Sequence, residues 1–231
     1  MFHIVDKSWN YFVEPWNRWS NAGVASFYVE AAIHIARVSH TILLARHGSH
    51  AELGVSLSGR SEIALNDAGR AEARRLADRL RTVRLAAIHS SPRRRAVETA
   101  SVVAADQHIG VEIVPALDEL DFGEWSGRTF DALANEPGWQ NWNRARGSAA
   151  TPSGETMASA TARAVRHIET IKENGPVLCV SHCDIIRGVA AHYLGLSADR
   201  LLSFDCDPAS LTTLALYEGG GRVVSLNERA A

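Results

Sequence analysis

The chain has 231 residues, which is enough for one domain and a short appendage. Its hydrophobic fraction of 46% and charged fraction of 22% are those of an ordinary globular protein and exclude wholesale disorder and fibrous repeats. A net charge of -2 argues against a dedicated nucleic-acid-binding protein. Nearly all of the basic residues are arginines, the side chain that binds phosphate or carboxylate through two parallel hydrogen bonds.

Three features bear on where the protein resides. Three cysteines are too few for a disulfide framework, so a reducing compartment is expected. The best candidate for a membrane span, Val24 to Ala45, is interrupted by charged and histidine side chains. The N-terminus lacks the basic start and the compact apolar run of a signal peptide. We therefore expect a cytoplasmic protein that binds neither a membrane nor a nucleic acid.

Residues 1–40 differ in composition from the rest of the chain. Half of the sixteen aromatic residues lie within the first 28 positions, and this segment holds few charges. We interpret it as an N-terminal extension of unknown role, with a helix expected over Val24–Val38. Its aromatic side chains are expected to cover an apolar patch of the main domain or of a partner, and whether the chain forms homo-oligomers stays open.

From Thr41 onward, short apolar strands alternate with amphipathic helices. The predicted strands, in chain order, are Thr41–Ala45, Ala86–His89, Val111–Pro115, Val177–Val180 and a closing hairpin of Leu211–Tyr217 and Arg222–Leu226. The predicted helices run from a cap at Asn66 or Asp67 to Val83, from Pro92 to Ala105, around Thr129–Asn135, over Glu155–Asn174 and from His182 to Leu194. This alternation predicts an α/β fold, in which helices cover both faces of a mostly parallel sheet.

Polar residues follow several of the predicted strands. Ligands of parallel sheets bind at the carboxyl ends of the strands, so the side chains just after each strand are candidates for a site. They are Arg46-His47-Gly48, Ser90-Ser91-Pro92 with the arginines behind it, Asp118-Glu119 and Ser181-His182. Two histidines, several arginines and a carboxylate are therefore predicted to meet at one edge of the sheet.

His47 and Arg95 suggest a particular chemistry for this edge. A neutral imidazole attacks phosphorus well, and neighbouring guanidinium groups disfavour protonation of His47. Gly48 is expected to let the backbone approach a phosphate closely. Arg95 lies near the start of a helix, an end that favours anions. Taken singly, each element is equally compatible with an ordinary turn or with a solvent-exposed basic helix start.

Six motifs together resemble the histidine phosphatase superfamily, also called the phosphoglycerate mutase-like family. They are LARHG at 44–48, LNDAGR at 65–70, SSPRRRAVETA at 90–100, ELDFGEWSG at 119–127, GET at 154–156 and VSH at 180–182. The resemblance covers the chain from Thr41 to the C-terminus, so we expect a histidine phosphatase domain at 41–231. It implies a three-layer α/β/α sandwich of the phosphoglycerate mutase-like kind.

The resemblance also implies roles for individual residues. His47 would be the nucleophile that becomes phosphorylated, and His182 would face the same phosphate. Arg46 and Arg95 would bind the phosphoryl oxygens, which carry the negative charge of the transition state. Glu119 would be the general acid, because an alkoxide leaving group needs a proton.

Two alternatives concern these same residues. Three further carboxylates compete with Glu119 for the acid role, namely Asp118, Asp121 and Glu124, although Asp118 and Glu124 are expected to be solvent-exposed. A metal site is the second alternative, because histidines and carboxylates are zinc ligands. Clustered arginines would repel a divalent cation, so we expect neither a metal nor another cofactor.

The chain departs from the family pattern near the expected site. His50 stands where a Ser or Thr usually follows the signature, so a hydroxyl contact with the phosphate would be lost. Cys183-Asp184 replaces a glycine-containing pair. Asp184 is expected either at the mouth of the pocket, where it would disfavour an anionic leaving group, or as a cap of the helix that follows His182. Arg60 is expected either near the substrate, where it would offset that charge, or exposed.

These observations predict a phosphomonoester hydrolase that acts through a phosphohistidine intermediate on a small phosphorylated metabolite. Phosphoglycerate mutase-type transfer is an alternative, but the roughly 190 residues after Thr41 leave little room for the longer insertions that a second anion pocket requires. A non-catalytic, partner-binding member of the family is another alternative, and the presence of all the expected site residues argues against it. Sugar phosphates, α-ribazole phosphate, phosphoserine and protein phosphohistidine all remain candidate substrates.

Overall fold

A computed structural model describes residues 40–229 of the chain. The chain divides into two units, Met1–Val38 and Ser39–Ala231. The helix expected over Val24–Val38 and nearly all of the aromatic-rich extension lie outside the described residues. The fold is therefore that of the second unit.

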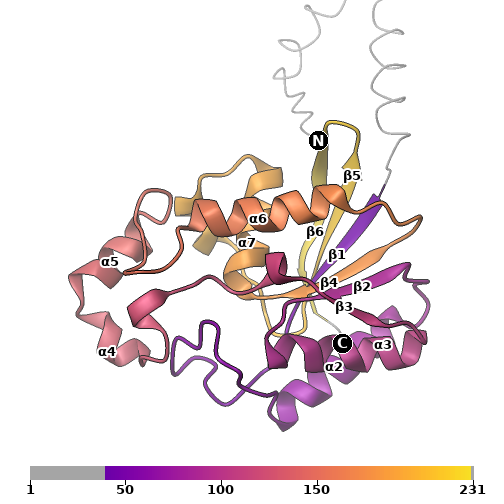
Figure 1. The fold of residues 1–231 in the computed structure, drawn as a ribbon, viewed down its shortest axis with the longest axis horizontal. Helices are drawn as coiled ribbons and strands as arrows, with labels where there is room; N and C mark the ends of the chain where they lie inside the picture. The colour runs from indigo at the N-terminus through magenta and orange to yellow at the C-terminus, as the bar shows by residue number, and fades with distance from the viewer. Residues whose placement is uncertain (1–39, 230–231) are drawn as a thin grey trace, which may run out of the picture. The chain divides into compact units, whose positions relative to one another are not determined.

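The second unit is built on a six-stranded sheet with the order β3-β2-β4-β1-β5-β6 (Figure 1). The strands are β1 (His40–Arg46), β2 (Ala87–Ser90), β3 (Val111–Ile113), β4 (Val177–Ser181), β5 (Leu211–Tyr217) and β6 (Gly220–Glu228). The four strands β1 to β4 pair in parallel, and β5 and β6 add an antiparallel hairpin at the edge beyond β1. The predicted mostly parallel sheet with a closing hairpin is confirmed.

Helices cover both faces of this sheet. One face carries α2 (Asp67–Leu80) and α3 (Arg94–Gln107), and the other carries α6 (Met157–Thr170) and α7 (Cys183–Leu194) (Figure 1). All residues of strand β4 are buried, and alternate side chains pack against the helices on opposite faces of the sheet. Val177 and Cys179 belong to the core under α6 and α7, whereas Leu178 and Val180 belong to the core under α2 and α3. The predicted three-layer α/β/α arrangement is confirmed.

The helix boundaries differ from the predicted ones at several ends. Asn66 caps α2 as predicted, since its side chain accepts a hydrogen bond from the Gly69 amide at 2.8 Å. Helix α3 begins at Arg94 and not at Pro92, because the Ser91 hydroxyl accepts the Arg93 amide and Arg93 is extended. Helices α2 and α6 end earlier than predicted, at Leu80 and Thr170, and β3 ends at Ile113.

The segment between β3 and α6 holds short helices that form a small aromatic cluster. They are the 3-10 helices Pro115–Leu117 and Gly123–Trp125, followed by α4 (Phe130–Ala134) and α5 (Pro137–Arg144). A helix around α4 was predicted from the sequence, and α5 was not. Trp142 of α5 is fully buried, and its ring lies 6.3 Å from that of Trp125. This cluster carries several side chains that line the cavity described next.

Candidate active site

The register between β1 and β4 brings the two predicted histidines together. Arg46 lies opposite Ser181 in the sheet, so the residues that follow each strand are neighbours. The His47 amide donates a hydrogen bond to the Ser181 carbonyl at 3.0 Å. The rings of His47 and His182 have centroids 5.1 Å apart, and both side chains are buried. The structure thus places both histidines at the carboxyl edge of the sheet, as the sequence predicts.

Hydrogen bonds assign the tautomer of His47. Its Nδ1–H donates to the Gly48 carbonyl oxygen at 2.8 Å, and its Nε2 accepts from Nε of Arg95 at 3.2 Å. Burial lowers the pKa of His47 well below its usual value, and the charges of Arg95 and Arg46 act in the same direction. His47 is therefore neutral at pH 7, with the lone pair of Nε2 turned toward Arg95.

Arg95 is the one arginine of the 93–95 run that points into this site. It is only 1% exposed, and its guanidinium donates to the carbonyl oxygens of Gly59 at 2.7 Å and Ser61 at 3.0 Å. The other two arginines of the run form ion pairs with carboxylates that do not line the cavity, Arg93 with Glu62 and with Asp118 at 3.0 Å, and Arg94 with Glu98. A buried cation held only by neutral acceptors keeps its charge available for an anion.

His182 is fixed by a relay of hydrogen bonds. Its Nδ1 accepts from the Arg95 guanidinium at 3.1 Å, so its Nε2–H donates to the Ser91 hydroxyl at 2.7 Å. That hydroxyl donates in turn to Asp118 at 3.4 Å. Burial lowers the pKa of His182 well below its usual value, and Arg95 and the other nearby cations add to this. The relay corrects the expectation for Asp118, which is buried and positions His182 instead of facing solvent.

Glu119 is a buried carboxylic acid beside His182. Its Oε2 lies 3.7 Å from Nδ1 of His182, and its Oε1 accepts the Leu120 amide at 2.9 Å. Burial and the charge of Asp184 together raise the pKa of Glu119 to about 8, against the opposing charge of Arg95. Glu119 therefore carries its proton at neutral pH and can donate it.

Two arginines hold the backbone of Glu119 in place. Its carbonyl oxygen accepts from Nε of Arg60 at 2.9 Å and from Nη2 of Arg163 at 3.0 Å. Both guanidinium groups also bind Glu155. The residues that line the cavity do not include Arg60, so the structure gives it a positioning contact with Glu119. No motif in the sequence points to Arg163, which lies in the middle of α6.

These side chains open into a cavity of about 490 Å³. Its lining combines the predicted groups with polar and aromatic side chains from the segment between β3 and α6, among them Arg46, His47, Arg95, Glu119, Phe122, Phe130, Trp139, Asn143 and Arg146. Gly48 is not part of this lining. A Cβ at Gly48 would lie 2.5 Å from the Gly69 carbonyl oxygen, so the glycine permits close packing on α2.

Asp184 lies in the cavity wall as part of a buried ion pair. Its Oδ1 accepts from Nη1 of Arg146 at 2.8 Å, and both side chains are largely buried. The cap position of α7 belongs to His182, and Asp184 lies within the first turn. The capping alternative for Asp184 is therefore wrong, and the charge of Arg146 weakens the repulsion that was expected for an anionic leaving group.

His50 also lines the cavity. It is 6% exposed, its ring centroid lies 5.3 Å from that of His47, and its Nδ1 has no hydrogen-bond partner among residues 40–229. Burial lowers the pKa of His50 to about 4, and the charges of Arg95 and Arg46 contribute. A neutral imidazole with a buried nitrogen that has no partner among the described residues thus stands where a Ser or Thr hydroxyl was expected.

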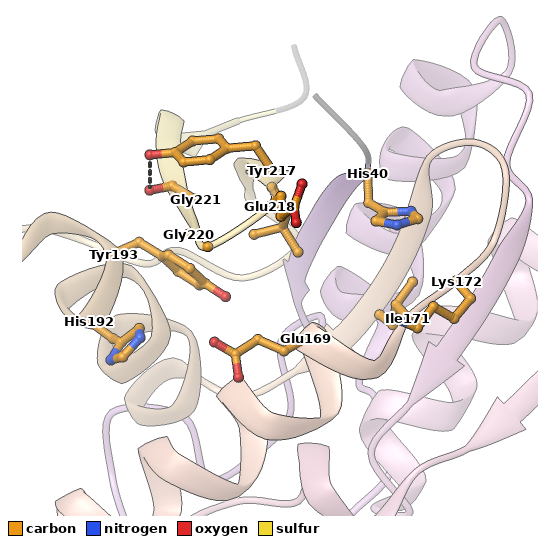
Figure 2. A pocket seen from close by; sticks show the side chains of 12 residues that line it. His40, Glu169, Ile171, Lys172, His192, Tyr193, Tyr217, Glu218, Gly220 and Gly221 are labelled. Carbon is orange, nitrogen blue, oxygen red and sulfur yellow. Dashed lines mark hydrogen bonds between the residues drawn. The ribbon is translucent and has the colours of Figure 1, made fainter. Parts of the chain in front are cut away.

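A second cavity, of about 800 Å³, lies at the opposite end of β1 (Figure 2). His40 at the start of β1, Glu169, His192 and Tyr193 contribute to its lining. Burial raises the pKa of Tyr193 to about 12, and Glu169 adds to this. None of the described residues in this lining is an arginine or one of the strand-end residues listed above. The first cavity, although smaller, is therefore the candidate active site because of the side chains that line it.

Comparison with known proteins agrees with this geometry. Residues 42–229 match the family model of the histidine phosphatase superfamily (branch 1). The chain belongs to this superfamily. It is 27% identical over 168 residues to phosphoserine phosphatase 1 of Hydrogenobacter thermophilus, covering 71% of this chain and 80% of the relative. It is 27% identical over 193 residues to adenosylcobalamin/alpha-ribazole phosphatase of Escherichia coli, covering 81% and 95%.

The solved structures extend the likeness to the fold. Bacillus stearothermophilus YhfR superposes with a TM-score of 0.77 at 28% identity, over 82% of this chain and 97% of that one. In the part of the chain that the structure describes, no three His, Cys, Asp or Glu side chains are grouped as metal ligands. Nor does any helix within residues 40–229 have the length and apolar character needed to cross a membrane.

Proposed function

We propose that the protein hydrolyses a phosphomonoester of a small metabolite through a phosphohistidine intermediate on His47. The observation that carries this proposal is the state of His47. The imidazole is neutral, its proton is held on Nδ1 by the Gly48 carbonyl, and its Nε2 faces the guanidinium of Arg95. A nucleophile needs such a lone pair aimed at the place where a phosphoryl group would be bound.

In the first step, Arg46 and Arg95 bind the phosphoryl oxygens of the substrate. The bound phosphoryl group takes the Arg95 donor away from Nε2 of His47, and the lone pair then attacks phosphorus. Negative charge on the transferred group is balanced by the two guanidinium groups. Glu119 gives its proton to the leaving oxygen, as its raised pKa allows. The alcohol departs and His47 carries the phosphoryl group.

In the second step, the Glu119 carboxylate removes a proton from a water molecule that attacks the phosphorus. The phosphorus–nitrogen bond breaks, Glu119 regains its proton and inorganic phosphate leaves. His182 stays neutral throughout, since its pKa is lowered, and its ring and the Arg95 guanidinium remain hydrogen-bonded. The cycle uses one proton site and regenerates both His47 and Glu119.

A small metabolite suits the cavity and agrees with the relatives. A volume of about 490 Å³ lies within the range of small-molecule sites. The curated relatives are named for phosphoserine and for α-ribazole phosphate, both small phosphomonoesters. The cavity wall adds aromatic rings and the Asp184–Arg146 pair, so substrates with both apolar and polar parts in the leaving group are the first to be assayed.

The test is trapping of the intermediate. Wild-type protein mixed with a ³²P-labelled phosphomonoester and quenched in alkali should hold an acid-labile, base-stable label, while releasing inorganic phosphate at steady state. His47→Ala should hold no label and show no turnover. His192→Ala, which removes an exposed histidine from α7, is the matched control and should behave as wild type. Label retained by His47→Ala would contradict the proposal, and a rearranged phosphoester in place of phosphate would indicate a mutase.

A further inference from the structure

Two of the three cysteines lie together beside Arg46. Cys183, the first residue of α7, is half-buried and lines the cavity, and Cys206 is buried in the loop that precedes β5. The Cys183 thiol donates to the Cys206 carbonyl oxygen at 3.8 Å, and the two thiols lie close enough to shift each other's pKa. Both are free thiols. This contact makes Cys183 and Cys206 neighbours, and Cys183 is open to the cavity.

The surroundings make the two thiols unequal. The hydrogen bond from Cys206 lowers the pKa of Cys183 to about 7, and although burial opposes this, Arg46 supports it. The N-terminal position of Cys183 on α7 also stabilises a thiolate. The same hydrogen bond, together with burial, raises the pKa of Cys206. Cys183 is therefore the reactive thiol, and Cys206 is placed to react with it in a second step.

We propose that Cys183 is a site of oxidation by hydrogen peroxide, and that Cys206 converts the oxidised thiol into an intramolecular disulfide. In the first step the Cys183 thiolate attacks one peroxide oxygen. A sulfur–oxygen bond forms, the oxygen–oxygen bond breaks, and the departing hydroxide takes up a proton to become water. The sulfur is oxidised to a sulfenic acid while the peroxide is reduced.

In the second step the Cys206 sulfur attacks the sulfenic sulfur of Cys183. A sulfur–sulfur bond forms, the sulfur–oxygen bond breaks, and hydroxide leaves with the proton that the Cys206 thiol gives up. The products are a disulfide and a second water molecule. Two thiols and one peroxide are consumed, and the disulfide can be reduced again by an external dithiol.

The disulfide has a direct route to the candidate phosphate site. Nη1 of Arg46 donates to the Cys206 carbonyl oxygen at 2.6 Å, so this carbonyl positions the guanidinium. A covalent link between Cys206 and the first turn of α7 would draw that carbonyl away from its present place. Oxidation should therefore weaken phosphate binding, a consequence that rests on the proposed function, whereas formation of the disulfide does not.

The experiment counts thiols and follows activity in the same samples. The purified full chain is treated with hydrogen peroxide, quenched with catalase and titrated with a thiol reagent under denaturing conditions. The number of free thiols should fall from three to one, and peptide mapping should show Cys183 joined to Cys206. Phosphatase activity should be lost in parallel and return on treatment with dithiothreitol. Inorganic phosphate present during the oxidation should slow both changes, because it occupies the cavity.

Single variants separate the two steps. The activity of each variant after peroxide treatment is compared with that of the same variant kept in its reduced, thiol form. Cys183→Ser should keep its activity in peroxide, and Cys206→Ser should form a sulfenic acid that dimedone traps at Cys183. Cys179→Ala is the matched control and should oxidise like wild type, because Cys179 is buried in β4 and burial raises its pKa. Three thiols after peroxide, or inactivation of Cys183→Ser at the wild-type rate, would overturn the proposal. The thiol count remains informative even if no phosphomonoester is turned over.

Discussion

Replacing Glu119 with Gln should separate substrates by their leaving groups. Gln matches the shape of the acid but has no proton to transfer, and Glu119 is protonated at neutral pH because burial raises its pKa to about 8. An alkyl phosphate, whose alkoxide needs that proton, should lose about 10²–10⁴-fold in kcat/KM, which corresponds to about 3–5 kcal/mol of transition-state stabilisation. A nitrophenyl phosphate, whose leaving group departs without a proton, should lose far less.

The assay compares kcat/KM for the two substrates in the wild type and in Glu119→Gln across the pH range. For the alkyl phosphate, wild-type kcat/KM should fall as the pH rises through about 8, where Glu119 loses its proton. This fall should be absent from the small residual rate of the variant. Equal losses on the two substrates would refute the reasoning, because they would show that Glu119 does not protonate the leaving group.

Unfolding provides an independent check on the same carboxyl group. The folded chain holds the proton of Glu119 up to a pH of about 8, whereas the unfolded chain releases it near its ordinary pKa of 4.5. The stability that protonated Glu119 contributes is therefore complete below 4.5 and is lost as the pH rises toward 8. Glu119→Gln lacks this dependence, so its Tm should exceed that of the wild type by an increasing margin over this range. A constant Tm difference would contradict the raised pKa.

Further predictions concern the surroundings of this acid. His182→Ala should keep at most a small fraction of the activity but still trap the phosphohistidine label, and loss of the label would show that His182 is needed for the first step. EDTA should leave turnover unchanged because arginines supply the positive charge, and a loss that added metal reverses would refute this. Asp184→Asn should move the alkaline limit of kcat/KM to lower pH, since the Asp184 charge raises the pKa of Glu119, and an unmoved limit would count against that coupling. Gly48→Ala should lower the Tm by several degrees or prevent folding, because the added Cβ would lie 2.5 Å from the Gly69 carbonyl oxygen. A Tm equal to that of the wild type would show that the backbone moves apart to accept the Cβ.

Much of the fold could be predicted because its signals are local. Four short β-rich runs followed by amphipathic helices are typical of a parallel sheet, and the carboxyl ends of such strands lie at one edge whatever their order. That rule alone brings His47 near His182. Helix ends were less certain, because their exact residues depend on contacts such as the one between the Ser91 hydroxyl and the Arg93 amide.

The positioning contacts of the site could not be predicted, because they join residues far apart in the chain. Asp118 resembles its exposed neighbours in the sequence, and only the fold shows it buried beneath Ser91. Arg163 lies in an Ala-rich helix, where an arginine is most often solvent-exposed, yet it holds the Glu119 backbone from 44 residues away. No local pattern distinguishes these residues from surface charges, and their roles follow only from the packing of α6 against the segment after β3.

The Asp184–Arg146 pair shows how such contacts set the chemistry of the site. Arg146 pairs with Asp184 within the cavity wall, and the negative charge of Asp184 is one of the causes that raise the pKa of Glu119. Burial together with this charge keeps Glu119 protonated, while burial together with the guanidinium groups of Arg95 and Arg46 keeps His47 neutral. Glu119 thus keeps a proton that a carboxyl group in water loses at neutral pH, and His47 loses the partial protonation that an imidazole in water retains. Burial, the charge of Asp184 and the charges of the arginines therefore prepare the acid and the nucleophile before any substrate is bound.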